Sequence, residues 1–261
     1  MHMETPTVII EESAPAALPT RPQRNRFFVG MAVAMLATVF LGFARTYYLK
    51  NIFPTPSFPL LFHIHGALFT AWMLLLVVQA WLVASRRTAL HRRVGRIGLF
   101  LVVLMLLAGS LVSVAGARGD GPIRAAMARG ERPVVDVPPP LEVLAGNLRG
   151  MLLFGVFAGA GLWFRRRPDV HKRFMMLATL VLLQPALGRA AILVFGAPNP
   201  ALVFGAMALF IVAMMVHDRQ TRGPMHPVTL WAGLSLLLSF PAARALGNTN
   251  LWLGFASWLV R

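Results

Sequence analysis

Apolar residues in this chain gather in long, almost uninterrupted stretches. Each stretch lies near the ~20 residues that an α-helix needs to cross a bilayer. They cover residues 27–44, 61–84, 97–116, 147–164, 174–195, 201–217 and 228–245. The pattern predicts an all-α fold, a polytopic membrane helix bundle with about seven transmembrane helices in one domain over residues 27–245.

The two ends of the chain have a different character. Residues 1–26 are polar and contain several prolines, which predicts a disordered N-terminal tail. Residues 246–261 include an apolar stretch too short to cross a membrane, so we expect a C-terminal helix lying at the interface, with Trp252 and Trp258 as anchors. The longest predicted loop, 117–146, contains "GDGP" and "VDVPPP" and a segment, "IRAAMARGE", that could form a short surface helix.

Composition supports a membrane protein and removes several kinds of chemistry. The chain is 57% hydrophobic and only 13% charged, against about 25% charged residues in a soluble domain. It contains no cysteine, which excludes disulfides, thiolate metal sites, iron–sulfur clusters and covalently attached haem. The short motifs of metalloproteases, serine hydrolases and Walker-type nucleotide-binding proteins are also absent.

The formal net charge of +16 is explained by membrane topology rather than by nucleic-acid binding. If the N-terminus is inside, the inner segments hold roughly twice as many Lys and Arg residues as the outer segments. The sequence therefore predicts an inner-membrane protein with a cytoplasmic N-terminus and an external C-terminus. The lipid bilayer is the expected partner, and no nucleic acid is expected.

Two inner loops are similar to each other, and a third is a weaker version. They read "RRTALHRRVGR" over 86–96, "RRPDVHKRF" over 166–174 and "RGPMHP" over 222–227, and each has an arginine four residues before its histidine. Arg189 follows His171 by the same spacing, 18 residues, with which Arg244 follows His226. This register predicts three related helical hairpins, formed by spans 2–3, 4–5 and 6–7, as in transporters with parallel repeats. The alternative is that arginine-rich inner loops resemble one another without a true repeat.

The histidines of these loops are the first candidate site. The repeat puts His91, His171 and His226 at one depth, near the inner ends of three spans. Two neutral imidazoles on different helices could ligate haem b iron, and the neighbouring arginines suit haem propionates. The alternative is that each histidine lies at the interface, capping a helix or meeting lipid phosphate.

Arginines inside the membrane form the second candidate site. Arg189 and Arg244 lie within predicted spans, where all nine acidic residues are absent, and His65 and Gln184 are polar residues of neighbouring spans. The two guanidinium groups could face one outer cavity with His65 and Gln184 and bind a small anionic or amphipathic ligand. Alternatively, each arginine reaches outward to the lipid headgroups.

One short motif resembles a known family. "LHRRVGR", Leu90 to Arg96, resembles the His-Arg-x-x-Gly-Arg signature of uncharacterised bacterial polytopic membrane proteins, and "HIHGALFTAW" and "VHKRFM" extend the similarity. That family implies no activity. A weaker similarity is to small b-type haem membrane proteins, in which histidines near helix ends ligate iron. Three functions stay open: binding a small anionic or amphipathic ligand, binding haem in a redox or assembly protein, or acting as a structural subunit of a membrane complex.

Overall fold

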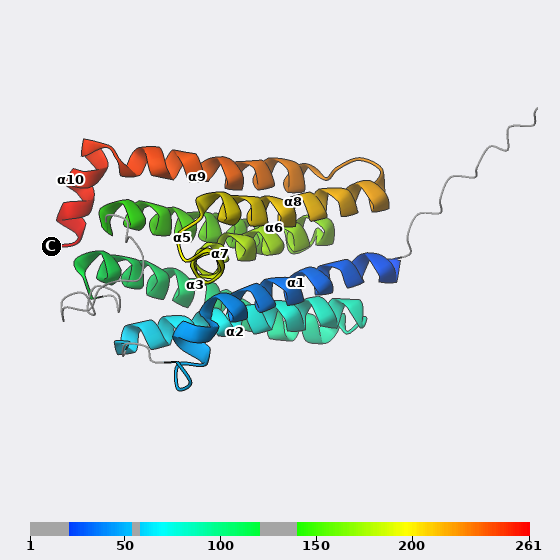
Figure 1. Ribbon diagram of the computed structural model, residues 1–261. Coiled ribbons are helices and arrows are strands. Elements are labelled where there is room, and N and C mark those ends of the chain that lie inside the picture. Colours follow the sequence, from blue (N-terminus) through cyan, green and yellow to red (C-terminus); the bar gives the residue numbers. More distant parts are fainter. Residues whose placement is uncertain (1–20, 54–57, 121–139) are drawn as a thin grey trace, which may run out of the picture.

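The computed structural model describes residues 21–53, 58–120 and 140–261, and these residues form helices joined by short connections (Figure 1). The elements in chain order are α1 (Arg21–Phe43), the π-helical turn η1 (Ala44–Tyr48), α2 (Leu60–Ala84), α3 (Thr88–Arg118), α5 (Pro140–Trp163), α6 (Pro168–Val181), α7 (Gln184–Phe195), α8 (Pro200–Arg222), the π-helical turn η2 (Val228–Ala232), α9 (Gly233–Gly247) and α10 (Asn250–Leu259). The predicted all-α bundle is confirmed.

Several of these helices are suited to a bilayer. In the described part of the chain, six helices are long and apolar enough to cross a membrane, and α6 with α7 makes up a seventh, bent span. No more than 33% of the apolar window of each of the six is buried inside the bundle. The remaining apolar surface faces outward from the bundle, and lipid is the solvent in which such surface is stable. The protein is therefore an integral membrane protein.

The bundle has two distinct ends (Figure 1). One end, here called the basic end, holds the start of α1 and the connections at 85–87, 164–167 and 223–227. The opposite end holds η1, the start of α2, and α10. Consecutive helices α2 and α3, and α5 and α6, pack against each other, while α1 contacts both α2 and α7. The repeat relating the hairpins stays a prediction.

The fifth predicted span, 174–195, is broken rather than continuous. Helices α6 and α7 are bent by 46° at the two residues between them, and Figure 1 shows α7 turned away from the direction of α6. Pro185, at the start of α7, lacks the N–H that would bond to the carbonyl four residues earlier, at Val181. The bend therefore sits where proline interrupts the helical hydrogen bonds.

Three predicted boundaries were wrong because helices continue past the apolar stretches. Helix α1 begins at Arg21, so residues 21–26 are helical and not part of a disordered tail. Helix α5 begins at Pro140, so residues 140–146 are helical and not part of the predicted loop. Helix α8 continues to Arg222 and includes Asp218, so the expectation that all carboxylates lie outside the spans was also wrong. The rest of the predicted tail and the predicted surface helix lie outside the described residues.

The C-terminal helix α10 packs against the bundle through one of its two predicted anchors. Trp252 is buried, and its indole Nε1 donates a hydrogen bond to the backbone oxygen of Leu141 at 2.7 Å. Trp258 is exposed and remains suited to the interface. Trp252 therefore fixes α10 to the start of α5 and does not serve as a lipid anchor.

Candidate functional site

Two of the three predicted inner histidines lie together at the basic end. His91, in the first turn of α3, and His171, in the first turn of α6, have ring centroids 6.3 Å apart and ring planes at 84°. Both rings are partly buried. Two bonds of about 2.0 Å to a shared metal atom, with about 1.1 Å from each nitrogen to its ring centroid, give nearly the same separation. The spacing of the rings therefore suits two axial ligands of one metal atom.

The hydrogen bond of His171 fixes which of its nitrogens can bind a metal. Its Nδ1 lies 2.7 Å from the backbone oxygen of Gly161, and a carbonyl only accepts, so Nδ1 carries the proton. The Nε2 lone pair is then free to coordinate. A ligating histidine usually donates its other N–H in this way to a backbone carbonyl or carboxylate.

The ring of His91 is held by Gln79 of α2. The Gln79 amide nitrogen donates to Nδ1 and, at 3.2 Å, to the backbone oxygen of His91, while its oxygen accepts from Gly95 N–H at 2.9 Å. Because Nδ1 of His91 accepts this hydrogen bond, the proton of the neutral His91 ring is on Nε2. Coordination through Nε2 requires the proton on Nδ1, where it would meet the Gln79 amide N–H, so haem binding would require Gln79 to change these contacts.

A bare metal ion has too few ligands at this place. The described residues contain no group of three or more His, Asp or Glu side chains that could hold a metal ion. Zinc and similar ions normally take at least three protein ligands. Haem iron needs only two, because the porphyrin supplies the other four. The pair therefore fits haem iron better than a bare ion.

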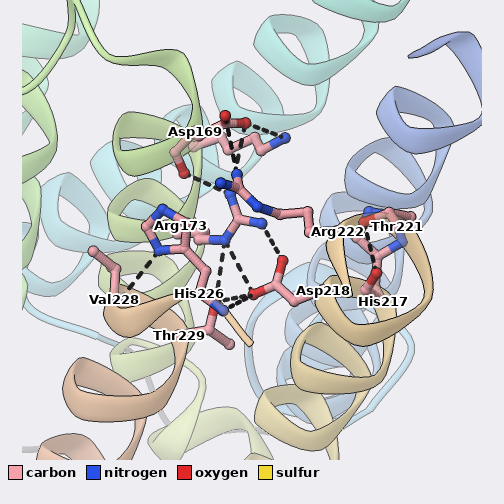
Figure 2. A network of polar contacts seen from close by, with 10 residues as sticks. Asp169, Arg173, His217, Asp218, Thr221, Arg222, His226, Val228 and Thr229 are labelled. Carbon is pink, nitrogen blue, oxygen red and sulfur yellow. Dashed lines mark hydrogen bonds and ion pairs between the residues drawn. The ribbon is translucent and has the colours of Figure 1, made fainter. Parts of the chain in front are cut away.

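The third predicted histidine belongs to a separate polar network, which joins α6, α8 and η2 (Figure 2). Its centre is an ion pair between Arg173 and Asp218, both only 1% exposed. Arg173 donates through Nε, at 3.2 Å, and through Nη2 to the two carboxylate oxygens of Asp218. Thr229 donates its hydroxyl to Asp218 at 2.6 Å, and His226 donates its backbone N–H at 3.3 Å. The buried charges are thus paired and hydrogen-bonded, as stability requires.

The side chain of His226 completes the turn that leads into η2. Its Nδ1 accepts a hydrogen bond from the backbone N–H of Val228 at 3.1 Å, which requires an unprotonated Nδ1. Burial, helped by the positive charges of Arg173 and Arg222, lowers the pKa of His226 below its usual value. His226 therefore holds the connection between α8 and η2 in its neutral form.

Asp169 ties the exposed side of the network together. Its carboxylate lies 3.3 Å from Lys172 Nζ and 3.0 Å from Arg222 Nη1, and its backbone oxygen accepts from Arg173 Nη1 at 2.6 Å. The sequence reading missed this network because it assigned Arg173 and Asp218 to basic loops. The sequence does contain one indication of the pair, because Asp218 directly follows the predicted span 201–217. A buried acidic residue at such a position needs a basic partner.

At the opposite end, Arg189 and His65, two of the predicted ligand-binding residues, belong to α7 and α2, which both pack against α1. Arg189 is partly buried, and its guanidinium carbon lies 4.4 Å from the centroid of the ring of Phe43, the last residue of α1. Arg189 also donates from Nη1 to the backbone oxygen of Pro185 at 3.3 Å. None of the described carboxylates forms an ion pair with it.

The other two predicted ligand-binding residues have different surroundings. Arg244 is exposed on α9. Gln184 accepts a hydrogen bond from Nη2 of Arg149, and Nη1 of Arg149 donates to Ser239 Oγ at 2.9 Å. Arg149 therefore connects α5, α7 and α9. The amide oxygen of Gln184, which the prediction assigned to a ligand, already accepts a hydrogen bond from Arg149.

Comparison with known proteins gives no relative: no family model, curated protein or solved structure matches this chain. The resemblance carried by Leu90–Arg96 stays a prediction. Evidence about function comes from the arrangement of the side chains.

Proposed function

We propose that this integral membrane protein binds one b-type haem, with His91 and His171 as the axial ligands. The observation that carries the proposal is the separation of 6.3 Å between the two ring centroids. The two histidines belong to different helices, so the iron would join α3 to α6. His226, the third predicted ligand, is not part of this proposal, because its Nδ1 and backbone N–H are engaged in the polar network.

The surroundings of the two histidines support haem in two further ways. Gly161 accepts from Nδ1 of His171 and orients that ring, as partners of ligating histidines usually do, and Gln79 contacts Nδ1 of His91. Arg86, Arg87 and Arg92 lie close to His91 in the chain, at the exposed basic end. Their guanidinium groups can pair with haem propionates at the water interface.

The chemistry of such a site is electron transfer. Haem iron held by two nitrogen ligands changes its oxidation state, and hydrogen bonds to the ligands tune the potential. Gln79 and Gly161 are the residues that would do so. Of the three functions that the sequence left open, this redox or assembly role has the most specific geometric support. A role as a structural subunit has none.

We also propose the inner membrane as the location, with the N-terminus in the cytoplasm and the C-terminus outside. The support is the concentration of arginine in the connections at 85–87 and 164–167, because basic loops remain on the cytoplasmic side. The haem would then lie near the cytoplasmic surface.

The haem proposal is tested by the absorption spectrum of the protein purified from cells supplied with a haem precursor. We expect a Soret band from the wild type, and its loss in both His91→Ala and His171→Ala, because each change removes one axial ligand. Gln79→Leu should keep the band and shift the reduction potential, since it removes only a partner of a ligand.

His63→Ala is the matched control, because this histidine lies on α2 at the opposite end of the bundle. It should leave the Soret band unchanged. A wild-type protein that stays colourless after reconstitution with haem would contradict the proposal. A band that survives both His91→Ala and His171→Ala would contradict it as well.

A further inference from the structure

The end of the bundle opposite the proposed haem holds polar side chains that are short of partners. We propose that Arg189, His65 and Thr46 form a binding site for an oxyanion, a carboxylate or a phosphate ester, attached to an apolar body. The site draws on α7, α2 and η1, and it does not depend on the haem.

Arg189 supplies the positive charge. A guanidinium has five N–H donors, and the described residues use one of them, in the bond to Pro185. One face of the guanidinium lies over Phe43, which leaves its edge for an acceptor. A charge within a membrane span normally has a counter-charge, and none of the described carboxylates is close enough to serve.

His65 and Thr46 supply two polar atoms without partners. The Nδ1 of His65 and the Oγ1 of Thr46 are buried, and neither makes a hydrogen bond. Buried polar atoms of this kind are rare, and an absent ligand or ordered water is the usual reason. No other buried side-chain nitrogen or oxygen in the described residues is left in this state.

The hydroxyl of Thr46 differs from those of four threonines in the α-helices. Thr38, Thr70, Thr179 and Thr221 each donate to the backbone oxygen four residues earlier. Thr46 does not, and it lies in the π-helical turn η1, where backbone bonds run to the fifth residue instead. Such turns inside helices are frequent at functional sites. The turn frees this hydroxyl from the backbone.

The turn that contains Thr46 is held in place by the contacts of Tyr47 and Tyr48 with α2. The Tyr47 ring lies against Gly66, where a Cβ atom would come within 2.6 Å of the ring. The Tyr47 hydroxyl donates to the backbone oxygen of His63 at 3.2 Å, and the Tyr48 hydroxyl is 2.8 Å from Thr70 Oγ1. These contacts fix η1 on the first turns of α2, and they bring Thr46 to the helix that carries His65.

The chemistry of the three side chains defines the ligand. Arginine binds carboxylates and phosphates through parallel N–H bonds. His65 and Thr46 can each donate to an oxygen or accept from a hydroxyl. Phe43, Phe69 and the two tyrosines offer apolar surface, and Phe69 lies 4.1 Å from His65 between ring centroids. An oxyanion on an apolar body matches all of these, whether it is a free acid or a lipid headgroup.

The experiment measures the melting temperature of the full-length protein with three probes: octanoate, inorganic phosphate, and nanodiscs of phosphatidylcholine with or without phosphatidylglycerol. We expect at least one probe to raise the melting temperature of the wild type. Arg189→Gln should weaken the apparent affinity by about tenfold or more, because it removes a charged hydrogen-bond donor. Arg244→Gln, at an exposed arginine of α9, is the matched control and should respond like the wild type.

Thr46→Val separates binding from folding. Without a probe it should melt at or above the wild-type temperature, because it removes a buried hydroxyl without a partner. With a probe it should gain less than the wild type. Stabilisation by octanoate or phosphate in micelles indicates a free anion, and stabilisation by phosphatidylglycerol alone indicates a lipid headgroup. The proposal is overturned if no probe stabilises the wild type, or if Arg189→Gln and Arg244→Gln respond alike.

Discussion

At the scale of single residues, the best-defined feature is the buried pair of Arg173 and Asp218. Arg173 belongs to α6, Asp218 to α8 and their partner Thr229 to η2, so the pair connects α6, α8 and the start of the last span. The pair is satisfied by the protein itself, which distinguishes it from Arg189 and indicates a structural role. Replacing a satisfied buried ion pair by apolar residues is often neutral, whereas removing one partner is costly.

This difference gives a prediction. Arg173→Met or Asp218→Leu alone should destabilise the protein by about 3–5 kcal/mol, because each leaves one buried charge without its partner. The double variant Arg173→Met/Asp218→Leu should be clearly more stable than either single variant. Thermal unfolding in detergent measures all four proteins as a double-mutant cycle. If the two single effects simply add, the ion pair does not couple these helices.

Some of the residues described above could be predicted from sequence, and others could not. His91 and His171 were predicted together because similar loops put them at one depth, and the structure places their ring centroids 6.3 Å apart. Arg173 and Asp218 were missed, because a charge at the end of an apolar stretch looks the same whether it is solvated or paired. Thr46 could not be found from sequence, since its missing hydrogen bond depends on a π-helical turn that no residue pattern marks.

At the scale of helices, the crossing of α1 and α7 brings two backbones close together at Gly42. A Cβ atom on Gly42 would clash with the backbone of Ala186, and its distance to the carbonyl carbon would be 2.7 Å. Backbone atoms cannot turn aside as a side chain can. The guanidinium of Arg189 lies over the ring of the next residue, Phe43. The crossing of the two helices therefore also positions the proposed anion site.

Gly42→Ala should therefore destabilise the protein by about 1–3 kcal/mol, the usual cost of overpacking. The control is Gly30→Ala on the same helix, where a Cβ would meet nothing within 4 Å. That change should be neutral or slightly stabilising, because alanine favours a helix. Melting temperatures of the two variants in the same detergent make the comparison. Equal effects would show that α1 does not pack on α7 through Gly42.

Helices were predicted from sequence better than their ends or their breaks. Long apolar stretches mark the spans because the bilayer requires them. The sequence predicted 174–195 as one continuous span, and it did not show that this span would be broken at Pro185 into two helices bent by 46°. The polar end of α8 continues as helix because Asp218 and Arg222 have charged partners in α6, and hydropathy alone does not register such contacts.

At the scale of the whole molecule, the distribution of arginine predicts the orientation. The chain has no cysteine, so single cysteines can be introduced without a background. Ala89→Cys, near the proposed haem, should resist a membrane-impermeant maleimide in intact cells and react after lysis. Asn248→Cys, between α9 and α10, should react in intact cells, and it is exposed in the bundle. The reverse pattern would show that the proposed topology is inverted.

The ion pair between α6 and α8 also bears on how the chain enters the membrane. Arg173 leaves the ribosome 45 residues before Asp218, a delay of about 2–9 s at 5–20 residues per second. During that delay α6 is short and carries a guanidinium without its buried carboxylate, and a helix of this kind partitions poorly into lipid alone. We therefore expect the nascent α6–α7 segment to insert less readily in a chain that ends before α8 than in one that includes it.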